Sequence, residues 1–172
     1  RQNNLVLFIA VFVSCLAGFY NGFPFVFTDT GTYIATGYSG TVPGDRSLFY
    51  GLFLRHVSLS QSLWLVILAQ SWITCWFIQL TVSSFFTGLK KNLIFFWIIV
   101  FITFLTGYSI NVSILIPDIF SAVVILGFYN LLFNDNLTKL KTSALILLTA
   151  FAFSTHLSNI PILFLGLIIL LS

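Results

Sequence analysis

Long apolar stretches alternate with short polar segments along the whole chain. A helix needs about 20 mostly apolar residues to cross the hydrocarbon core of a bilayer. Six stretches are apolar enough to be predicted as transmembrane helices: residues 5–27, 63–86, 93–108, 119–133, 145–155 and 160–172. The fifth is short and rich in Ser and Thr, so we expect it to be kinked or re-entrant. The pattern predicts an all-α fold, a polytopic transmembrane helix bundle that forms a single membrane domain over residues 1–172.

The first long connection, residues 28–62, contains a second kind of apolar stretch. Residues 47–56 are apolar but too few to span a bilayer, and arginines bracket them. Such a stretch is typical of a helix that lies in the plane of the membrane interface. We therefore expect a short interfacial helix within this connection.

Composition supports a membrane protein. The chain is 59% hydrophobic and only 6% charged, and its mean hydropathy is +1.07, which is far from soluble globular proteins. The two cysteines lie in apolar stretches, so neither a disulfide nor a metal site is predicted. Basic residues occur singly or in pairs beside apolar segments, which indicates membrane topology and argues against nucleic acid as a partner. The chain has no Met and begins with Arg, so we expect a fragment truncated at both ends.

The lysines predict which connections share a side of the membrane. They lie in even-numbered connections, as the pairs Lys90–Lys91 and Lys139–Lys141, on the same side as Arg1. Because cytoplasmic loops are enriched in Lys and Arg, we expect that side to be the cytoplasm. The sequence shows no long soluble domain and no eukaryotic retention signal, so we expect a bacterial inner membrane. Connections 28–62, 109–118 and 154–159 then face outward. They contain Asp29, Asp45, Arg46, Arg55, His56, Asp118 and His156. Ionisable chemistry is thus predicted on one rim of the bundle.

Each acid on this rim has a structural and a functional interpretation. Asp29 is either the N-cap of a short helix that runs through Tyr33 or a general base, because desolvation at the lipid edge favours proton uptake. Asp45 and Arg46 follow a Pro-Gly turn. Either they form a local ion pair, or Arg46 holds a phosphate oxygen. Asp118 follows a proline, where an acid suits the positive end of a helix dipole.

The remaining candidates also have two interpretations. Arg55 and His56 either extend to lipid headgroups or contact a ligand. His156 is either an interfacial residue or a proton carrier. Ionisable residues avoid the middle of every predicted span; Gln70, Ser71 and Thr74 are the most polar residues there, and interhelical hydrogen bonding is their predicted role.

The rim resembles that of the GT-C class of polytopic membrane glycosyltransferases. Members carry an acid in the first outward loop, just after the first transmembrane helix, and that loop continues into an interfacial helix. The corresponding stretches here are "FTDTGTYI" and "GDRSLFYGLFLRH", and "IPDIF" is similar to a later helix that begins with a second acid. The resemblance covers the N-terminal part of a typical member.

The resemblance implies transfer of a sugar from a polyprenyl-phosphate-linked donor to an acceptor on the outer side of the membrane. Asp29 would be the general base, Asp118 would orient the acceptor or assist a cation, and Arg46 would neutralise the departing phosphate. The other residues that the resemblance assigns to substrate binding are Asp45, Tyr33, Arg55, His56 and His156. The sequence assigns no metal ligands and leaves the cofactor and the oligomeric state open.

Two other functions are consistent with the same sequence. A transporter or flippase is one, although transporters build sites at the bilayer midplane, where this chain has no charge. A non-catalytic membrane scaffold is the other, in which each acid caps a helix and each arginine reaches the headgroups.

Overall fold

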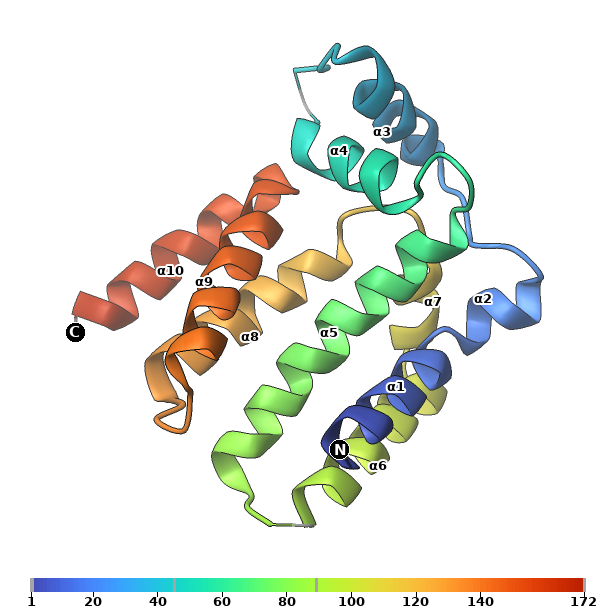
Figure 1. Cartoon of the computed structure of the whole chain (residues 1–172). Coiled ribbons are helices and arrows are strands. Elements are labelled where there is room, and N and C mark those ends of the chain that lie inside the picture. The colour runs from blue at the N-terminus through green and yellow to red at the C-terminus, as the bar shows by residue number, and fades with distance from the viewer. Residues whose placement is uncertain (1, 45, 89, 172) are drawn as a thin grey trace.

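The computed structural model describes residues 2–44, 46–88 and 90–171, and helices account for most of them (Figure 1). In chain order the helices are α1 (Gln2–Ser14), α2 (Leu16–Asn21), α3 (Thr28–Ser39), α4 (Leu48–Val57), α5 (Trp64–Phe85), α6 (Lys90–Leu105), α7 (Tyr108–Ser113), α8 (Ile119–Phe133), α9 (Lys139–Ser154), the 3-10 turn η1 (Leu157–Asn159) and α10 (Ile160–Leu171). Within these ranges the β-structure is one isolated bridge, between Phe25 and Ile114. The predicted all-α fold is confirmed.

Each of the six apolar stretches contains helix, but most of the helices are short. Among the described residues, α5 is the one helix long and apolar enough to cross a bilayer by itself. The pair α9 and residues 157–166, bent by 118°, passes the same test when taken together. Helices α6, α8 and α9 have 15 or 16 residues, so each extends about 24 Å at 1.5 Å per residue, less than the roughly 30 Å of a hydrocarbon core. A bundle of six spans is therefore not confirmed.

The first predicted span is interrupted. Helix α1 ends before Cys15, and α2 ends at Gly22, whose φ of 76° is a left-handed conformation that glycine adopts without strain. The chain then continues in extended form, and Phe25 exchanges backbone hydrogen bonds with Ser113 and Leu115. Residues 22–27 thus run across the bundle to α7 rather than completing a helix.

The connection 28–62 forms two helices, α3 and α4. Helix α4 coincides with the predicted interfacial stretch, and the Ser47 hydroxyl caps it by accepting the Phe49 N–H at 3.1 Å. The two helices pack closely at Gly37 and Gly51. A Cβ at Gly51 would lie 2.7 Å from the Tyr33 carbonyl oxygen, so the close approach requires glycine there.

Helix α5 runs through the middle of the molecule and contributes to both hydrophobic clusters (Figure 1). Its polar residues bond to other elements. Gln70 accepts the Tyr50 hydroxyl at 2.7 Å and donates to the Val112 carbonyl at 2.9 Å, and Ser71 donates to the Val11 carbonyl at 3.0 Å. Thr74 instead donates to the Gln70 carbonyl within the helix. Interhelical bonding is thus found for two of the three residues for which it was predicted.

The connections gather at two opposite ends. The α5–α6 and α8–α9 connections lie together at one end, next to the start of α1 (Figure 1). This end, which carries Lys90, Lys91, Lys139 and Lys141, is called the lysine end. The other end is formed by α3, α4 and the connections that follow α7 and α9, and is called the α3–α4 end.

Candidate functional site

Asp29 and Arg46 form an ion pair at the α3–α4 end. Arg46 Nη2 donates a hydrogen bond to Asp29 Oδ1 at 2.8 Å. The Arg46 side chain is 27% exposed and the Asp29 side chain is 35% exposed. Asp29 is in the first turn of α3, where the helix dipole favours a negative charge. The pair is therefore partly shielded from solvent yet open to a ligand.

Asp29 is not the N-cap of α3. The N-cap is Phe27, whose backbone N–H donates to the Thr30 hydroxyl at 2.9 Å. The Asp29 carboxylate is thereby directed to Arg46 instead of to the backbone of its own helix. The structural interpretation of Asp29 as a cap is wrong, because Thr30 supplies the side-chain partner at this terminus. Asp45, predicted as the local partner of Arg46, lies outside the described residues.

Asp118 and His156 form a second contact at the same end, which is an ion pair only when the imidazole is protonated. Asp118 Oδ1 lies 3.3 Å from His156 Nε2, and the Asp118 side chain is 57% exposed. His156 Nδ1 accepts the Ser158 backbone N–H at 3.1 Å and lies 2.6 Å from the Ser158 hydroxyl. Because Nδ1 is an acceptor, the neutral imidazole carries its proton on Nε2, which donates to Asp118.

Hydrogen bonds connect the elements that carry the two pairs. Ser47, next to Arg46, donates its hydroxyl to the Ser154 carbonyl at the end of α9, two residues before His156. Thr30, next to Asp29, donates to the Leu115 carbonyl at 3.0 Å, three residues before Asp118. Both pairs thus lie on one framework in which α3 is fixed to the start of α8 and α4 to the end of α9.

Tyr33 lies beneath this framework rather than on its surface. Its side chain is 2% exposed and meets the Tyr50 ring edge to face, with the ring centroids 5.0 Å apart. Burial is the main cause that raises the pKa of Tyr50 well above its usual value, and the nearby Tyr33 and Asp118 side chains raise it further. Tyr50 therefore stays protonated and donates to Gln70. Tyr33, predicted to bind substrate, instead packs in an aromatic core that supports the rim.

Arg55 and His56 lie at the C-terminal end of α4. The Arg55 guanidinium donates to the Gly37 carbonyl at 3.3 Å and sits 5.4 Å from the centre of the Tyr38 ring, a cation–π distance. His56 Nδ1 lies 2.7 Å from the Leu52 carbonyl of its own helix. Both side chains are exposed, and these contacts bind them to α3 and α4 rather than to the two ion pairs.

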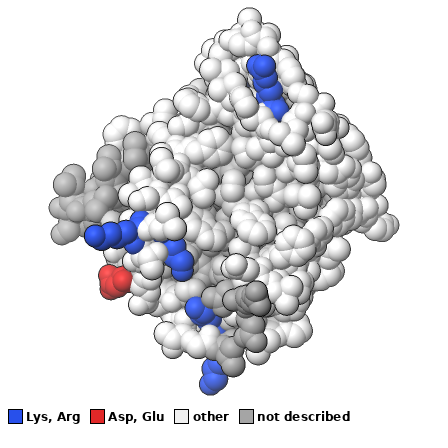
Figure 2. Space-filling model, viewed as in Figure 1, with Lys and Arg blue, Asp and Glu red and all other residues white. Residues whose placement is uncertain are grey.

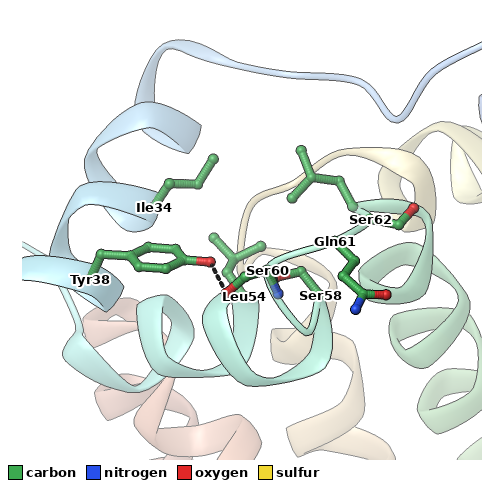
Figure 3. Close-up of a pocket in the computed structure, with 8 residues that line it drawn as sticks. Ile34, Tyr38, Leu54, Ser58, Ser60, Gln61 and Ser62 are labelled. Carbon is green, nitrogen blue, oxygen red and sulfur yellow. Dashed lines mark hydrogen bonds between the residues drawn. The ribbon is translucent and has the colours of Figure 1, made fainter.

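A cavity of about 250 Å³ lies between α3, α4 and the α4–α5 connection (Figure 3). Its lining is mainly apolar, from Ile34, Leu54 and Leu63, and it also includes Tyr38, Gln61 and three serines. The Tyr38 and Ser60 hydroxyl oxygens are 2.7 Å apart. Ser60 and its neighbour Leu59 have φ of 54° and 52°, a left-handed conformation that costs non-glycine residues energy. Sequence reasoning missed this cavity; its only signal is the hydroxyl-rich "SLSQS".

Asp118 lines a different cavity, of about 410 Å³, together with Tyr108 and Asn111 of α7. Asp29 is not among the residues that line it. The structure therefore pairs Asp29 with Arg46 and Asp118 with His156, on one framework, but does not join the two acids in this space. Among the described residues, no group of three His, Cys, Asp or Glu side chains could hold a metal ion.

The fold and the site together define an all-helical protein with two ion pairs at one end and lysines at the other. Comparisons with protein-family models, with curated proteins and with solved structures found no match to this chain. The resemblance to GT-C glycosyltransferases therefore stays a prediction, and the function must be argued from the residues themselves.

Proposed function

We propose that this chain belongs to a membrane glycosyltransferase that moves a sugar from a polyprenyl-phosphate-linked donor to an acceptor hydroxyl at the α3–α4 end. The observation that supports the proposal is the partly exposed Asp29–Arg46 pair, with 2.8 Å between its oxygen and nitrogen. Sugar transfer from a lipid phosphate needs a base for the acceptor proton and a cation for the departing phosphate. The pair supplies both side by side.

The proposed reaction uses the two partners in sequence. The acceptor hydroxyl donates a hydrogen bond to Asp29, and its oxygen attacks the anomeric carbon of the donor. The bond from that carbon to the phosphate oxygen breaks, the phosphate leaves with the electron pair, and the acceptor proton moves to Asp29. A guanidinium has five N–H donors in a planar fork, so Arg46 can hold the phosphate while one donor stays on Asp29.

The rest of the α3–α4 end has chemistry suited to the same substrates. In this proposal Asp118 and His156 position the acceptor, since the His156 Nε2–H and the carboxylate offer a donor and an acceptor side by side. The cavity between α3 and α4 has an apolar wall and a few polar side chains, among them Gln61 and Ser62, that could contact a sugar ring (Figure 3).

The proposal also includes a membrane orientation. Helix α5, with 22 residues, is long enough to cross the bilayer. The four lysines at the opposite end favour the cytoplasm for that end, which directs the α3–α4 end to the outer surface, where polyprenyl-linked sugars are presented in the GT-C class.

The alternative is a scaffold in which the ion pairs only fasten helices together. It is favoured by the fact that Asp29 and Arg46, and Asp118 and His156, already satisfy one another. The transporter alternative gains no support from the described residues, because the polar centre of α5 is occupied by bonds to neighbouring backbone.

The variant Asp29→Asn separates enzyme from scaffold. The amide oxygen still accepts from Arg46, but it is not a base, so we expect at least about a 100-fold loss of sugar transfer from a labelled polyprenyl-phosphate donor in membranes that contain the intact protein. Asp135→Asn, the same change on an exposed acid of the α8–α9 connection, is the matched control and should leave transfer unchanged. Equal transfer by both variants would leave the scaffold as the function.

A further inference from the structure

A cavity of about 450 Å³ lies at the lysine end, far along the bundle from the two ion pairs. It is enclosed by the start of α1, by the stretch from Trp72 of α5 to the start of α6, and by the α8–α9 connection with the start of α9. Three parts of the chain that are distant in the sequence therefore converge on one space. The proposed sugar transfer does not use this space.

Two cations from different helices line the cavity. Lys91 comes from the first turn of α6 and Lys141 from the first turn of α9. Neither forms an ion pair within the described part of the chain, and side-chain amides of Asn4 and Asn136 lie on the same lining. Figure 2 shows Lys and Arg side chains gathered over this end of the molecule, with one acid beside them. The lining thus offers positive charge and hydrogen-bond donors to an anion.

The deeper wall of the cavity is apolar and aromatic. Trp72 and Trp76 of α5 and Leu7 of α1 line it below the lysines. Both indoles lie near the middle of α5, about 14–20 Å along the helix from its Phe85 end, which is the depth of acyl chains in a bilayer. A cationic rim above an aromatic wall fits an amphiphile with a phosphate group better than it fits a free ion, which gains nothing from the wall.

We propose that this cavity binds an anionic phospholipid, with Lys91 and Lys141 on the phosphate of its headgroup and the tryptophans against an acyl chain. Basic pockets between helices at the cytoplasmic face are the places where such headgroups bind. The nearby Asp135 carboxylate belongs to the α8–α9 connection but does not line the cavity. The inference rests on the membrane placement proposed above but not on sugar transfer.

The test compares two lysine pairs with the same charge. Purified intact protein in neutral detergent is mixed with phosphatidylglycerol or phosphatidylcholine, and bound lipid is measured by native mass spectrometry. The double variant Lys91→Gln/Lys141→Gln removes the cavity cations. The double variant Lys90→Gln/Lys139→Gln removes two neighbouring cations that do not line the cavity. Both variants lower the net charge equally.

We expect phosphatidylglycerol to bind in preference to phosphatidylcholine and the cavity variant to bind it about tenfold more weakly, with little change in the control variant. Equal loss in both variants would overturn the proposal, because a diffuse surface charge would then explain binding. Displacement of the lipid by inorganic phosphate would also overturn it, in favour of a phosphate-ion site. No sugar donor is present, so this result is independent of the test of Asp29.

Discussion

The two ends of this molecule use similar side chains in opposite ways. At the α3–α4 end, side chains are paired across elements, Asp29 with Arg46 as an ion pair and Asp118 with the His156 imidazole by a hydrogen bond. At the lysine end, positive side chains lie along one edge of the molecule, and none of the four lysines has an ion pair among the described residues (Figure 2). Paired charges hold helices and each other in fixed positions, whereas a group of like charges attracts an anion from outside.

Packing and hydrogen bonds fix the geometry of the α3–α4 end. The α3–α4 end has two packed glycines, a capped helix and side-chain bonds to the backbone of α9 and of the α7–α8 connection. Chemistry requires reacting groups to be held in place by such a supporting shell. A headgroup that is bound mainly by charge does not.

The largest effect is expected from Arg46. Removing a group that stabilises charge in the transition state costs about 100-fold or more in rate, so Arg46→Gln should lower kcat for sugar transfer by about that factor. Arg46→Lys keeps the charge but loses the planar fork, so its kcat should lie between that of the unaltered protein and that of Arg46→Gln. Lys139→Gln removes a cation from the lysine end and should leave the rate unchanged. Equal losses in all three would mean that net charge, not position, governs the rate.

The next effect concerns the glycines between α3 and α4. Gly51→Ala places a methyl group 2.7 Å from the Tyr33 carbonyl, and such overpacking costs about 1–3 kcal/mol of stability. Because α4 must then move from α3, the Asp29–Arg46 contact should loosen and sugar transfer should fall with the melting temperature. Gly31→Ala, on the open side of α3, meets nothing within 4 Å and should be neutral or slightly stabilising. Both variants are compared by thermal unfolding in detergent.

Hydropathy alone predicts most of the helices but not how many cross a membrane. Five predicted stretches match α5, α6, α8, α9 and α10 because apolar runs favour helices wherever backbone groups must bond internally. The break after α2 depends on Gly22 and on the pairing of Phe25 with the distant residues 113–115. No local pattern contains that information.

The same limit applies to the site. Sequence reasoning predicted that Asp29, Arg46, Asp118 and His156 belong to one rim, since the alternation of connections depends only on counting helices. It did not predict the partners, because Asp29 meets Arg46 only through the packing of α3 on α4. Tyr33 was predicted to bind substrate, but its side chain is buried against Tyr50 in the aromatic core.

Tyr50 tests the support beneath the rim. Tyr50→Phe leaves the buried side-chain amide oxygen of Gln70 without its hydroxyl partner, which should lower the free energy of unfolding by about 1–2 kcal/mol. Tyr20→Phe, on a side chain that is 97% exposed, should have no effect on the same unfolding measurement.

The raised pKa of Tyr50 predicts how stability depends on pH. Burial raises the pKa of Tyr50 in the folded protein above its usual value of 10.0, so below pH 10 both the folded and the unfolded state are protonated and its contribution to stability is complete. Above pH 10 the unfolded state releases the proton first, and stability falls with rising pH. The melting temperature of the unaltered protein should therefore fall more steeply above pH 10 than that of Tyr50→Phe. Parallel curves would mean that the Tyr50 hydroxyl is open to solvent.

The smallest effect is expected from Asp118 and His156. Asp118 is 57% exposed, and exposed ion pairs contribute about 0.2–1 kcal/mol because water screens them and ordering two side chains costs entropy. A double-mutant cycle with Asp118→Asn and His156→Gln, read by unfolding at pH 6, measures this coupling directly. A coupling of several kcal/mol would make this pair a structural clasp between α8 and the turn after α9. A small coupling together with a large loss of sugar transfer would instead separate binding from folding at this end, because the residues then act on the acceptor and not on the fold.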